Sequence, residues 1–144
     1  MNYDKINGYL VDIFNNVVLI EEASLKNSKF NDVSLKEMHT IDVIGTHSDT
    51  TPSAVARELM LTLGTVTTSL NKLEKKGYII RTRSSVDRRV VHLSLSKKGR
   101  LVYRLHRGFH KSMVMRITEG FNDEELKVMS KGLENLHAFL EELK

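Results

Sequence analysis

The sequence contains no cysteine and no long uninterrupted apolar run among its 144 residues. Without a thiol, the chain has no disulfide, no thiolate metal ligand, no cysteine nucleophile and no thiol-based redox sensor. A membrane span needs roughly 18 consecutive apolar residues, and no segment approaches that length. The first ten residues carry charges where a secretory signal peptide would have an apolar core. We therefore expect a cytoplasmic protein without a membrane partner.

Signatures of catalysis are also lacking. The sequence has no nucleophile and base at a diagnostic spacing, no Gly-rich phosphate loop and no paired carboxylates, so we expect no enzymatic activity. Its length and its apolar content of 40% suffice for one hydrophobic core but not for two independent ones. The prediction is a single unit that spans residues 1–144.

Basic residues are concentrated in the middle of the chain. Residues 57–107 contain 13 Lys or Arg against three acids, a net charge of +10, whereas the remaining residues sum to −6. Such an asymmetry indicates a polyanionic partner that the middle of the chain contacts, and nucleic acid is the usual one. A solvated basic face would have the same composition, so charge alone leaves both interpretations open.

Helical periodicity and capping signals divide the first half of the chain. Apolar residues recur at steps of three and four between residues 4 and 26, which predicts a long helix with a broad apolar stripe. Ser34 and Glu37 have the spacing of a capping box and begin a second helix, which we expect Gly45 to end. Thr51 before Pro52 predicts a short third helix that reaches about residue 59.

A fourth helix is predicted after Thr62, and its two faces differ. Its inward face is apolar, with Val66, Leu70 and Leu73 at steps of four and three, and Gly77 ends the helix. Its outward face displays short polar groups and then cations: Thr65, Thr68, Asn71, Lys72 and Lys75, with Thr67 to one side. Short polar side chains let a helix lie deep in the major groove and reach base edges, while lysines reach phosphates.

Two short antiparallel strands are predicted after this helix. Residues 78–85 and 89–96 are rich in β-branched and alternating residues, and they are joined around residues 86–88. The runs AVARELMLTLGTVTTSLNKLEKKGYIIR and DRRVVHLSLSKKG have the order and spacing of one known pattern. The chain resembles the MarR family of winged helix-turn-helix regulators over nearly its whole length.

The resemblance implies the fold class and the division of the chain. It implies a mainly α protein of six helices with a small antiparallel β-hairpin. The winged helix-turn-helix DNA-binding region would span residues 34–95, with a recognition helix at 63–76 and a wing at 81–93. Helical dimerisation segments would span residues 4–33 and 96–144.

The family pattern also assigns roles at the tip of the wing. An Asp-x-Arg motif maps onto Asp87 and Arg89, which implies that Arg89 enters the minor groove and that Asp87 orients it. A surface salt bridge at the hairpin tip is the plainer alternative. One departure from the pattern is Met60, which stands at the helix-turn-helix corner where glycine often supplies a left-handed turn. We expect that turn to be strained or differently shaped.

These observations predict a DNA interface made by the start of the third helix, the fourth helix and the wing. Its residues are Thr51, Ser53, Gly64, Thr65, Thr67, Thr68, Asn71, Lys72, Arg81, Arg83, Asp87, Arg88 and Arg89. The predicted function is that of a transcriptional repressor that binds double-stranded DNA.

The last helix has the spacing of a coiled-coil seam. Its apolar residues alternate steps of three and four: Leu126, Met129, Leu133, Leu136, Leu140 and Leu143. One helix alone cannot bury this stripe, and packing against the first helix is the intramolecular alternative. The resemblance implies that the terminal helices of two subunits intertwine in a homodimer. Two recognition helices would then meet major grooves about 34 Å apart, which predicts a palindromic operator.

Within the family, four segments resemble the branch of fatty acid biosynthesis repressors: FNNVVLIEE, SLKEMHTIDVIG, LTLGTVTTSLNKLEKKGY and KKGRLVYRLHRGFHK. The resemblance implies no bound cofactor and a corepressor, a long-chain acyl group on acyl carrier protein. Flexible methionines suit a variable acyl chain. The expected tunnel is lined by Ile13, Val17, Met38, Ile41, Leu105, Phe109 and Met113. The acidic carrier protein is expected to dock on Arg100, Arg104, Arg107 and Lys111.

Two alternatives stay open. Histidines and carboxylates are zinc ligands, and His106 and His110 stand one helical turn apart, with His39 and Glu21 or Glu22 on other helices. A zinc-responsive or small-ligand-responsive regulator of the same family is therefore the first alternative, although surface histidines have the same spacing. The second is a dimeric adaptor that makes no DNA contact, which would leave the basic middle of the chain unexplained.

Overall fold

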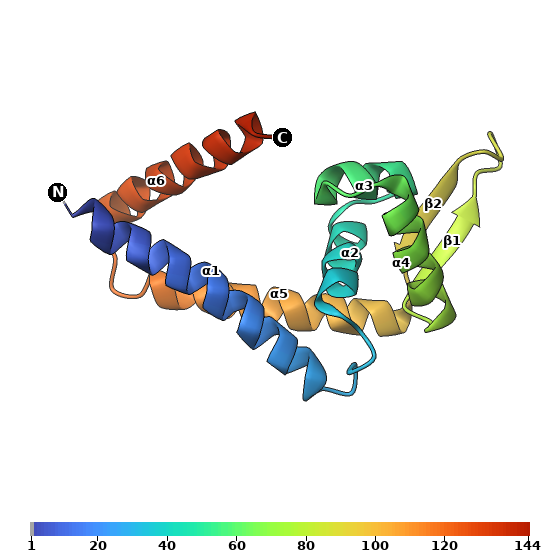
Figure 1. The fold of residues 1–144 in the computed structure, drawn as a ribbon, viewed down its shortest axis with the longest axis horizontal. Helices are drawn as coiled ribbons and strands as arrows, with labels where there is room; N and C mark the ends of the chain where they lie inside the picture. The colour runs from blue at the N-terminus through green and yellow to red at the C-terminus, as the bar shows by residue number, and fades with distance from the viewer. Residues whose placement is uncertain (1) are drawn as a thin grey trace. The chain divides into compact units, whose positions relative to one another are not determined.

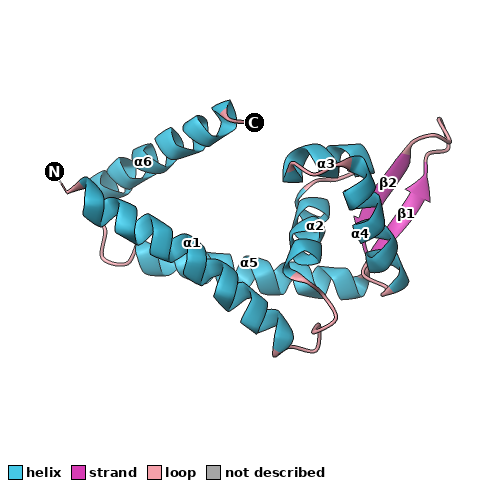
Figure 2. Ribbon diagram, viewed as in Figure 1, coloured by secondary structure: helices cyan, strands magenta, loops and turns pink. Residues whose placement is uncertain are grey.

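The computed structural model describes residues 2–144 and consists of six helices and one β-hairpin (Figures 1 and 2). The helices are α1 Tyr3–Lys26, α2 Leu35–Thr46, α3 Pro52–Leu59, α4 Leu63–Lys75, α5 Lys97–Ile117 and α6 Asp123–Glu142, and the strands are β1 Ile79–Arg83 and β2 Val91–Leu95. The predicted fold class is confirmed. The chain divides into two compact units, Met1–His106 and Arg107–Lys144.

The second helix begins as predicted but ends differently. The Ser34 hydroxyl accepts the Glu37 N–H at 3.1 Å, and the Glu37 carboxylate accepts the Ser34 N–H at 3.1 Å, so the capping box is complete. The expectation that Gly45 ends α2 is wrong, because the helix continues to Thr46. A Cβ at Gly45 would lie 2.5 Å from the ring of Tyr103 on α5. The glycine therefore allows close packing of α2 against that ring.

The helix-turn-helix is built from local signals. The Thr51 hydroxyl caps α3 by accepting the Ala54 N–H at 3.2 Å, and the Thr62 hydroxyl caps α4 by accepting the Thr65 N–H at 3.2 Å. Between the two helices, Met60 adopts the left-handed conformation, with φ 55° and ψ 43°. The strain predicted at this corner is therefore found, because the left-handed conformation is unfavourable for a residue with a Cβ.

The wing is a two-stranded antiparallel sheet. β1 and β2 pair from Ile79 opposite Leu95 to Arg83 opposite Val91. The segment before α3 adds one bridge to the outer edge of β2, where the Leu93 N–H donates to the Thr50 carbonyl at 2.8 Å. The hairpin is thus tied to the helix-turn-helix by backbone as well as by side chains.

The hydrophobic core of the first unit lies between α2, α3, α4, the hairpin and the start of α5, and it includes Leu25 of α1 and Phe30 and Val33 of the following segment. The three residues predicted to face inward on α4, namely Val66, Leu70 and Leu73, are at most 1% exposed. Full burial of such a side chain contributes about 1.5 to 3 kcal/mol. Because the core buries this apolar face, the opposite face of α4 is the one that a partner can contact.

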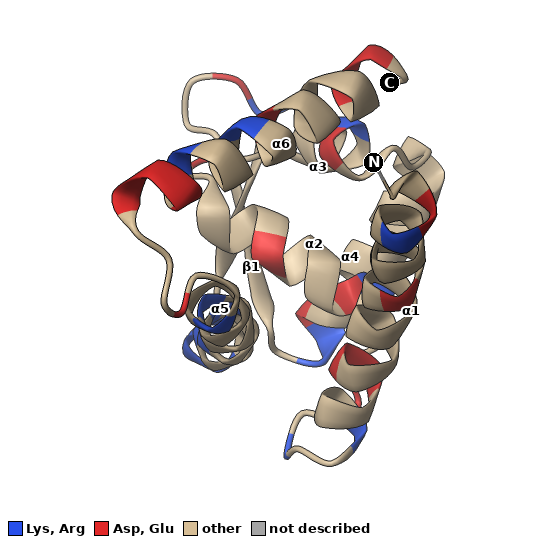
Figure 3. Cartoon of the chain, turned by 90° about the vertical axis from the view of Figure 1, so that its left-hand side faces the viewer, with Lys and Arg blue, Asp and Glu red and all other residues tan. Residues whose placement is uncertain are grey.

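The second unit contains the end of α5 and all of α6. The Asn122 side chain and Glu125 form a capping box at the start of α6. Acidic residues occupy its first turn, which is red in Figure 3. None of the residues of α6 is buried. Across residues 2–144, no helix has both the length and the apolar character to span a membrane.

Candidate nucleic-acid interface

The outward face of α4 carries threonines whose hydroxyl hydrogens are already engaged. Thr67 donates to the Leu63 carbonyl at 2.8 Å, and Thr68 donates to the Gly64 carbonyl at 3.1 Å. Both side chains are exposed. A hydroxyl that donates to its own helix still has a lone pair and, in threonine, a methyl group that faces outward. This face can therefore accept a hydrogen bond from a base amino group or contact a thymine methyl.

Asn71 and Arg81 lie in contact, although their residue types predicted only that each belongs to the interface. Arg81 on β1 donates through Nη2 to the Asn71 Oδ1 on α4 at 2.7 Å, and its Nε lies 3.8 Å from the Glu74 carboxylate. Figure 1 shows the neighbouring α4 and β1. Because its carbonyl is engaged, the Asn71 amide can present its NH₂ group as a donor.

The tip of the wing holds the predicted Asp-x-Arg pair. Asp87 accepts hydrogen bonds from the backbone N–H and the guanidinium of Arg89, whose side chain is 91% exposed. The side-chain and backbone hydrogen bonds from Arg89 lower the pKa of Asp87. Arg83 supports the same loop by donating to the Arg88 carbonyl at 3.2 Å. The predicted surface salt bridge thus exists, in a position that leaves the guanidinium accessible.

The other predicted DNA-contacting residues occupy surface positions with different roles. Ser53, Gly64, Lys72 and Arg88 are exposed. Thr51 is partly buried and its hydroxyl already caps α3. Its side chain therefore has less freedom to contact a phosphate than the sequence alone indicates.

One basic residue beside α4 was not predicted from the sequence. Lys36, in the first turn of α2, lines a hollow of about 330 Å³ together with Thr65, Thr68 and Lys72. Two lysines next to the threonine face suit a phosphate backbone. The only sequence signal was a lysine in the first turn of a capped helix, and its closeness to α4 depends on tertiary packing.

Polar contacts anchor the C-terminal end of α4 to the first turn of α2 and to the segment before α2. The Lys76 ammonium lies 3.1 Å from both Glu37 oxygens, and the Tyr78 hydroxyl donates to the Asp32 carboxylate at 2.5 Å. Burial and, after it, the hydrogen bond to Asp32 raise the pKa of Tyr78 well above its ordinary value. These contacts hold the residues that follow α4 against the start of α2 and the segment before it.

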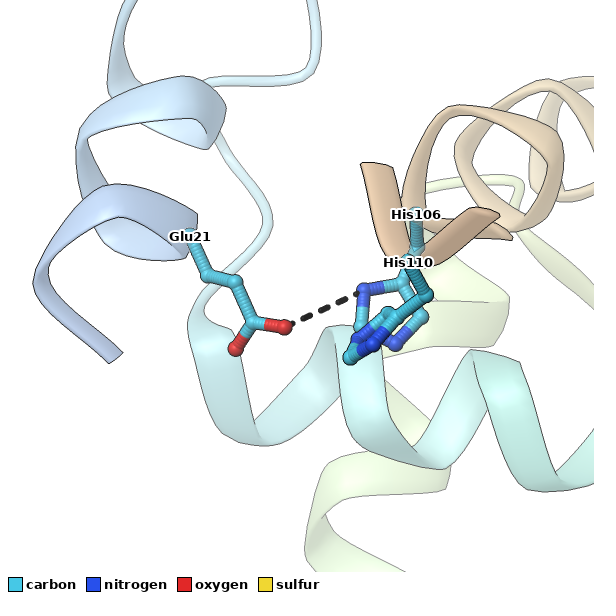
Figure 4. A group of neighbouring side chains, drawn as sticks. All are labelled: Glu21, His106 and His110. Atoms are coloured by element: carbon cyan, nitrogen blue, oxygen red, sulfur yellow. Dashed lines mark ion pairs between the residues drawn. The ribbon is translucent and has the colours of Figure 1, made fainter. Parts of the chain in front are cut away.

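Among the predicted metal ligands, Glu21 is central. Its side chain is 4% exposed, and one carboxylate oxygen lies 3.6 Å from the His106 Nδ1 (Figure 4). The other carboxylate oxygen lies 3.7 Å from the His39 Nε2. The two imidazole rings are 6.0 Å apart, centre to centre. Glu22 is exposed, and His110 follows His106 by one turn on α5. A buried carboxylate between two histidines is one cross-link between α1, α2 and α5.

The residues predicted to line an acyl tunnel differ in burial. Met38 and Ile41 belong to the hydrophobic core, whereas Ile13 and Leu105 are exposed and Val17 is half-buried. Phe109 and Met113 are half-buried in the second unit. All four predicted docking cations, Arg100, Arg104, Arg107 and Lys111, are exposed.

Comparison with known proteins gives a consistent result. A model of the MarR family matches residues 33–91. The crystal structure of FabT from Streptococcus pneumoniae in complex with DNA is 65% identical to the chain, superposes with a TM-score of 0.90, and each chain covers 99% of the other.

More distant relatives agree. The HTH-type transcriptional regulator PchR of Bacillus subtilis is 28% identical over 98% of this chain and 82% of its own length. A second regulator of that species, YwhA, is 32% identical over 69% of this chain and 73% of its own length. The complex of Staphylococcus aureus MepR with DNA has a TM-score of 0.72 at 20% identity, covering 92% of this chain and 94% of MepR, which supports the fold alone.

Proposed function

The chain belongs to the MarR family of winged helix-turn-helix transcriptional regulators, and we propose that it represses fatty acid biosynthesis genes as a homodimer. The proposed corepressor is a long-chain acyl group carried on acyl carrier protein. The observation that carries this proposal is the 65% identity, over 99% of the chain, to a FabT that was crystallised with DNA. The sequence resemblance to fatty acid biosynthesis repressors supports the same branch.

The chain is a DNA-binding regulator, and we assign its two grooves from the geometry. The threonine face of α4 and the Asn71 amide suit base edges in the major groove. Arg89 at the wing tip suits the narrow, electronegative minor groove. An adaptor without DNA contact would leave both features without a role.

Exposed apolar side chains support a homodimer. On α1, Ile6, Tyr9 and Phe14 are each more than 50% exposed. On α6, Leu133, Leu140 and Leu143 of the predicted seam are exposed. Large apolar surfaces on helices indicate burial against another chain. Two subunits related by a twofold axis would present two recognition helices to a palindromic operator.

Charge supports docking of an acidic carrier protein. Arg100 and Arg104 are exposed on α5, and complementary charge steers the association of proteins. An acyl chain that enters beside Met38 and Ile41 would need the core to rearrange, because those side chains are at most 4% exposed. Methionine adapts its shape more easily than branched residues do.

Titration of operator DNA tests the proposal. The purified full chain is mixed with labelled operator and with acyl carrier protein that is either loaded with a long acyl chain or unloaded. We expect the loaded form to tighten operator binding and the unloaded form to leave it unchanged. Equal operator affinity with both forms would contradict the corepressor, while DNA binding itself would still be measured in the same titration.

Metal control is a second candidate, favoured by Glu21 between His39 and His106. A carboxylate and two imidazoles are a common part of a zinc site. Metal analysis of the purified chain before and after a chelator tests it, together with Glu21→Gln. Glu22→Gln is the matched control, because Glu22 is the exposed neighbour. Equal zinc content in Glu21→Gln and the unaltered chain would exclude this site.

A further inference from the structure

A pocket of about 620 Å³ lies within the first unit, beside the base of the wing. Its lining comes from the end of α2, residues 47–49, both strands and the first turns of α5. The pocket is distinct from the outward face of α4 and from the contacts of Glu21. Nothing in the proposed DNA contacts uses it.

Two cations without acidic partners stand at this pocket. Arg100 and Arg104 are four residues apart on α5, so their side chains lie on the same face of the helix. Within residues 2–144, neither guanidinium takes part in an ion pair or a side-chain hydrogen bond. Asp49 is the one acid in the lining. The net charge of the lining therefore favours an anion.

Apolar side chains form one part of the remaining lining, beside polar residues that include His47, His92 and Ser94. Ile44, Leu93 and Leu95 contribute to the pocket, and each is less than 8% exposed. The ring of Tyr103 lies between the two arginines in sequence and also faces the pocket. Pockets that combine an apolar lining with a few charged groups are typical of small-molecule sites.

We propose that this pocket binds a small amphipathic anion, with a phosphate or carboxylate group on Arg100 and Arg104 and an apolar chain on Ile44, Leu93 and Leu95. Arginine suits such a group because its guanidinium donates paired hydrogen bonds to two oxygens. The pocket shares Arg100 and Arg104 with the proposed docking face for carrier protein, and it goes beyond the proposed function because the anion needs neither a carrier protein nor a second subunit.

Occupancy of the pocket would affect the wing. The pocket includes Leu93, whose N–H donates to the Thr50 carbonyl just before α3. A ligand that contacts α5, β2 and residues 47–49 together would hold these three parts in one arrangement. Such a ligand would stabilise the position of the wing for which it has the highest affinity.

Binding of octyl phosphate to the full chain, without DNA or carrier protein, tests the proposal. We expect saturable shifts of the backbone amide signals of residues 47–49 and 92–95 in NMR spectra, at concentrations below micelle formation. Octanoate tests a carboxylate head on the same chain length, octanol tests the chain alone, and inorganic phosphate tests the head alone. Octanol and inorganic phosphate should each bind at least tenfold more weakly than octyl phosphate.

Arginine variants make the test specific. Arg100→Ala with Arg104→Ala should weaken binding of octyl phosphate at least tenfold, while Lys97→Ala, an exposed cation of the same helix outside the pocket, should not change it. Arg100→Gln and Arg104→Gln singly keep most of the side-chain volume and guard against misfolding. Unchanged affinity in the arginine variants, octanol binding as tightly as octyl phosphate, or shifts confined to other residues would overturn the proposal.

Discussion

Asp87 accepts three hydrogen bonds from Arg89, one from its backbone N–H at 3.0 Å and two from its guanidinium at 3.2 and 3.3 Å. The contact orders a long side chain that is otherwise 91% exposed. Immobilising such a side chain at an interface costs about 0.5 to 1.5 kcal/mol. Because Asp87 already restrains the Arg89 side chain in the free protein, DNA binding incurs less of this free-energy cost.

Arg89→Ala should weaken operator binding by about 1 to 3 kcal/mol, because it removes a cation that we place beside bases in the minor groove. Fluorescence anisotropy with labelled operator measures the change. Asp87→Ala should weaken binding less, because the guanidinium remains and only its ordering is lost. The control is Arg116→Ala, which removes a similarly exposed arginine paired with Glu119 at 3.2 Å in the second unit. Equal affinities of Arg89→Ala and the unaltered chain would remove Arg89 from the interface.

Lys72→Ala should weaken binding to operator and to unrelated DNA by similar factors. Lys72 is exposed on the outward side of α4, where we expect it to bind a phosphate. Removing one phosphate-binding cation should reduce the slope of log affinity against log salt by about 0.9. Lys127→Ala, an exposed lysine of α6, is the control and should leave the slope unchanged. A weakening restricted to operator DNA would reassign Lys72 to base recognition.

Local signals predicted most of the fold. Thr62, Val66, Leu70 and Leu73 lie within three helical turns, so capping and apolar spacing determine α4 without reference to the rest of the chain. The prediction that Gly45 ends α2 was wrong because the sequence does not distinguish a glycine that ends a helix from a glycine that makes room for a neighbouring ring. The ring of Tyr103 that explains it lies 58 residues further along the chain.

The candidate site was predicted as a set of residues but not as a set of contacts. The residue types of Asn71 and Arg81 indicated DNA binding, but their hydrogen bond depends on how β1 packs on α4. Lys36 was missed for the same reason, since only tertiary packing brings the start of α2 to the threonine face. The periodicity of the sequence cannot predict contacts between side chains of separate helices and strands.

A double-mutant cycle on Asn71 and Arg81 should show coupling in operator binding. Arg81 orients the Asn71 amide through the 2.7 Å hydrogen bond, so removing either partner disturbs the same base contact. We expect a coupling energy of about 0.5 to 3 kcal/mol between Asn71→Ala and Arg81→Ala. Anisotropy titrations of the two single variants and the double variant measure this coupling energy. Pairing Asn71→Ala with Arg83→Ala is the control, and strictly additive effects for Asn71 and Arg81 would show that they act separately.

Alkaline unfolding should depend on Tyr78. Its raised pKa means that the unfolded chain ionises first, at an ordinary tyrosine pKa of about 10. The contribution of Tyr78 to stability is therefore fully present below pH 10 and is lost as the pH rises toward its folded-state pKa. Urea unfolding between pH 8 and 11 should show a steeper fall for the unaltered chain than for Tyr78→Phe. Tyr9→Phe, at a tyrosine that is 59% exposed, is the control and should leave the pH dependence unchanged. Parallel curves for Tyr78→Phe and the unaltered chain would contradict the assignment.

Substitution of Met60, at the corner of the helix-turn-helix, should increase the stability of the fold. A residue with a side chain at φ 55° and ψ 43° is less stable there by roughly 1 to 2 kcal/mol than in the right-handed region, whereas asparagine and glycine tolerate this conformation. The Met60 side chain is 61% exposed, so its removal sacrifices little apolar burial. Met60→Asn should therefore raise the free energy of unfolding by about 0.5 to 1 kcal/mol in urea titrations. Met60→Gly should raise it less, because glycine gains more entropy in the unfolded chain.

The matched control for Met60 is Met115, which is 64% exposed but lies inside α5. Met115→Asn should lower the free energy of unfolding, because asparagine is a poorer helix former than methionine. Opposite signs for the two substitutions would show that backbone conformation, and not the removal of methionine, sets the result. A Met60→Asn variant that is less stable than the unaltered chain would mean that the corner stores no strain, and that the methionine side chain itself supports the turn.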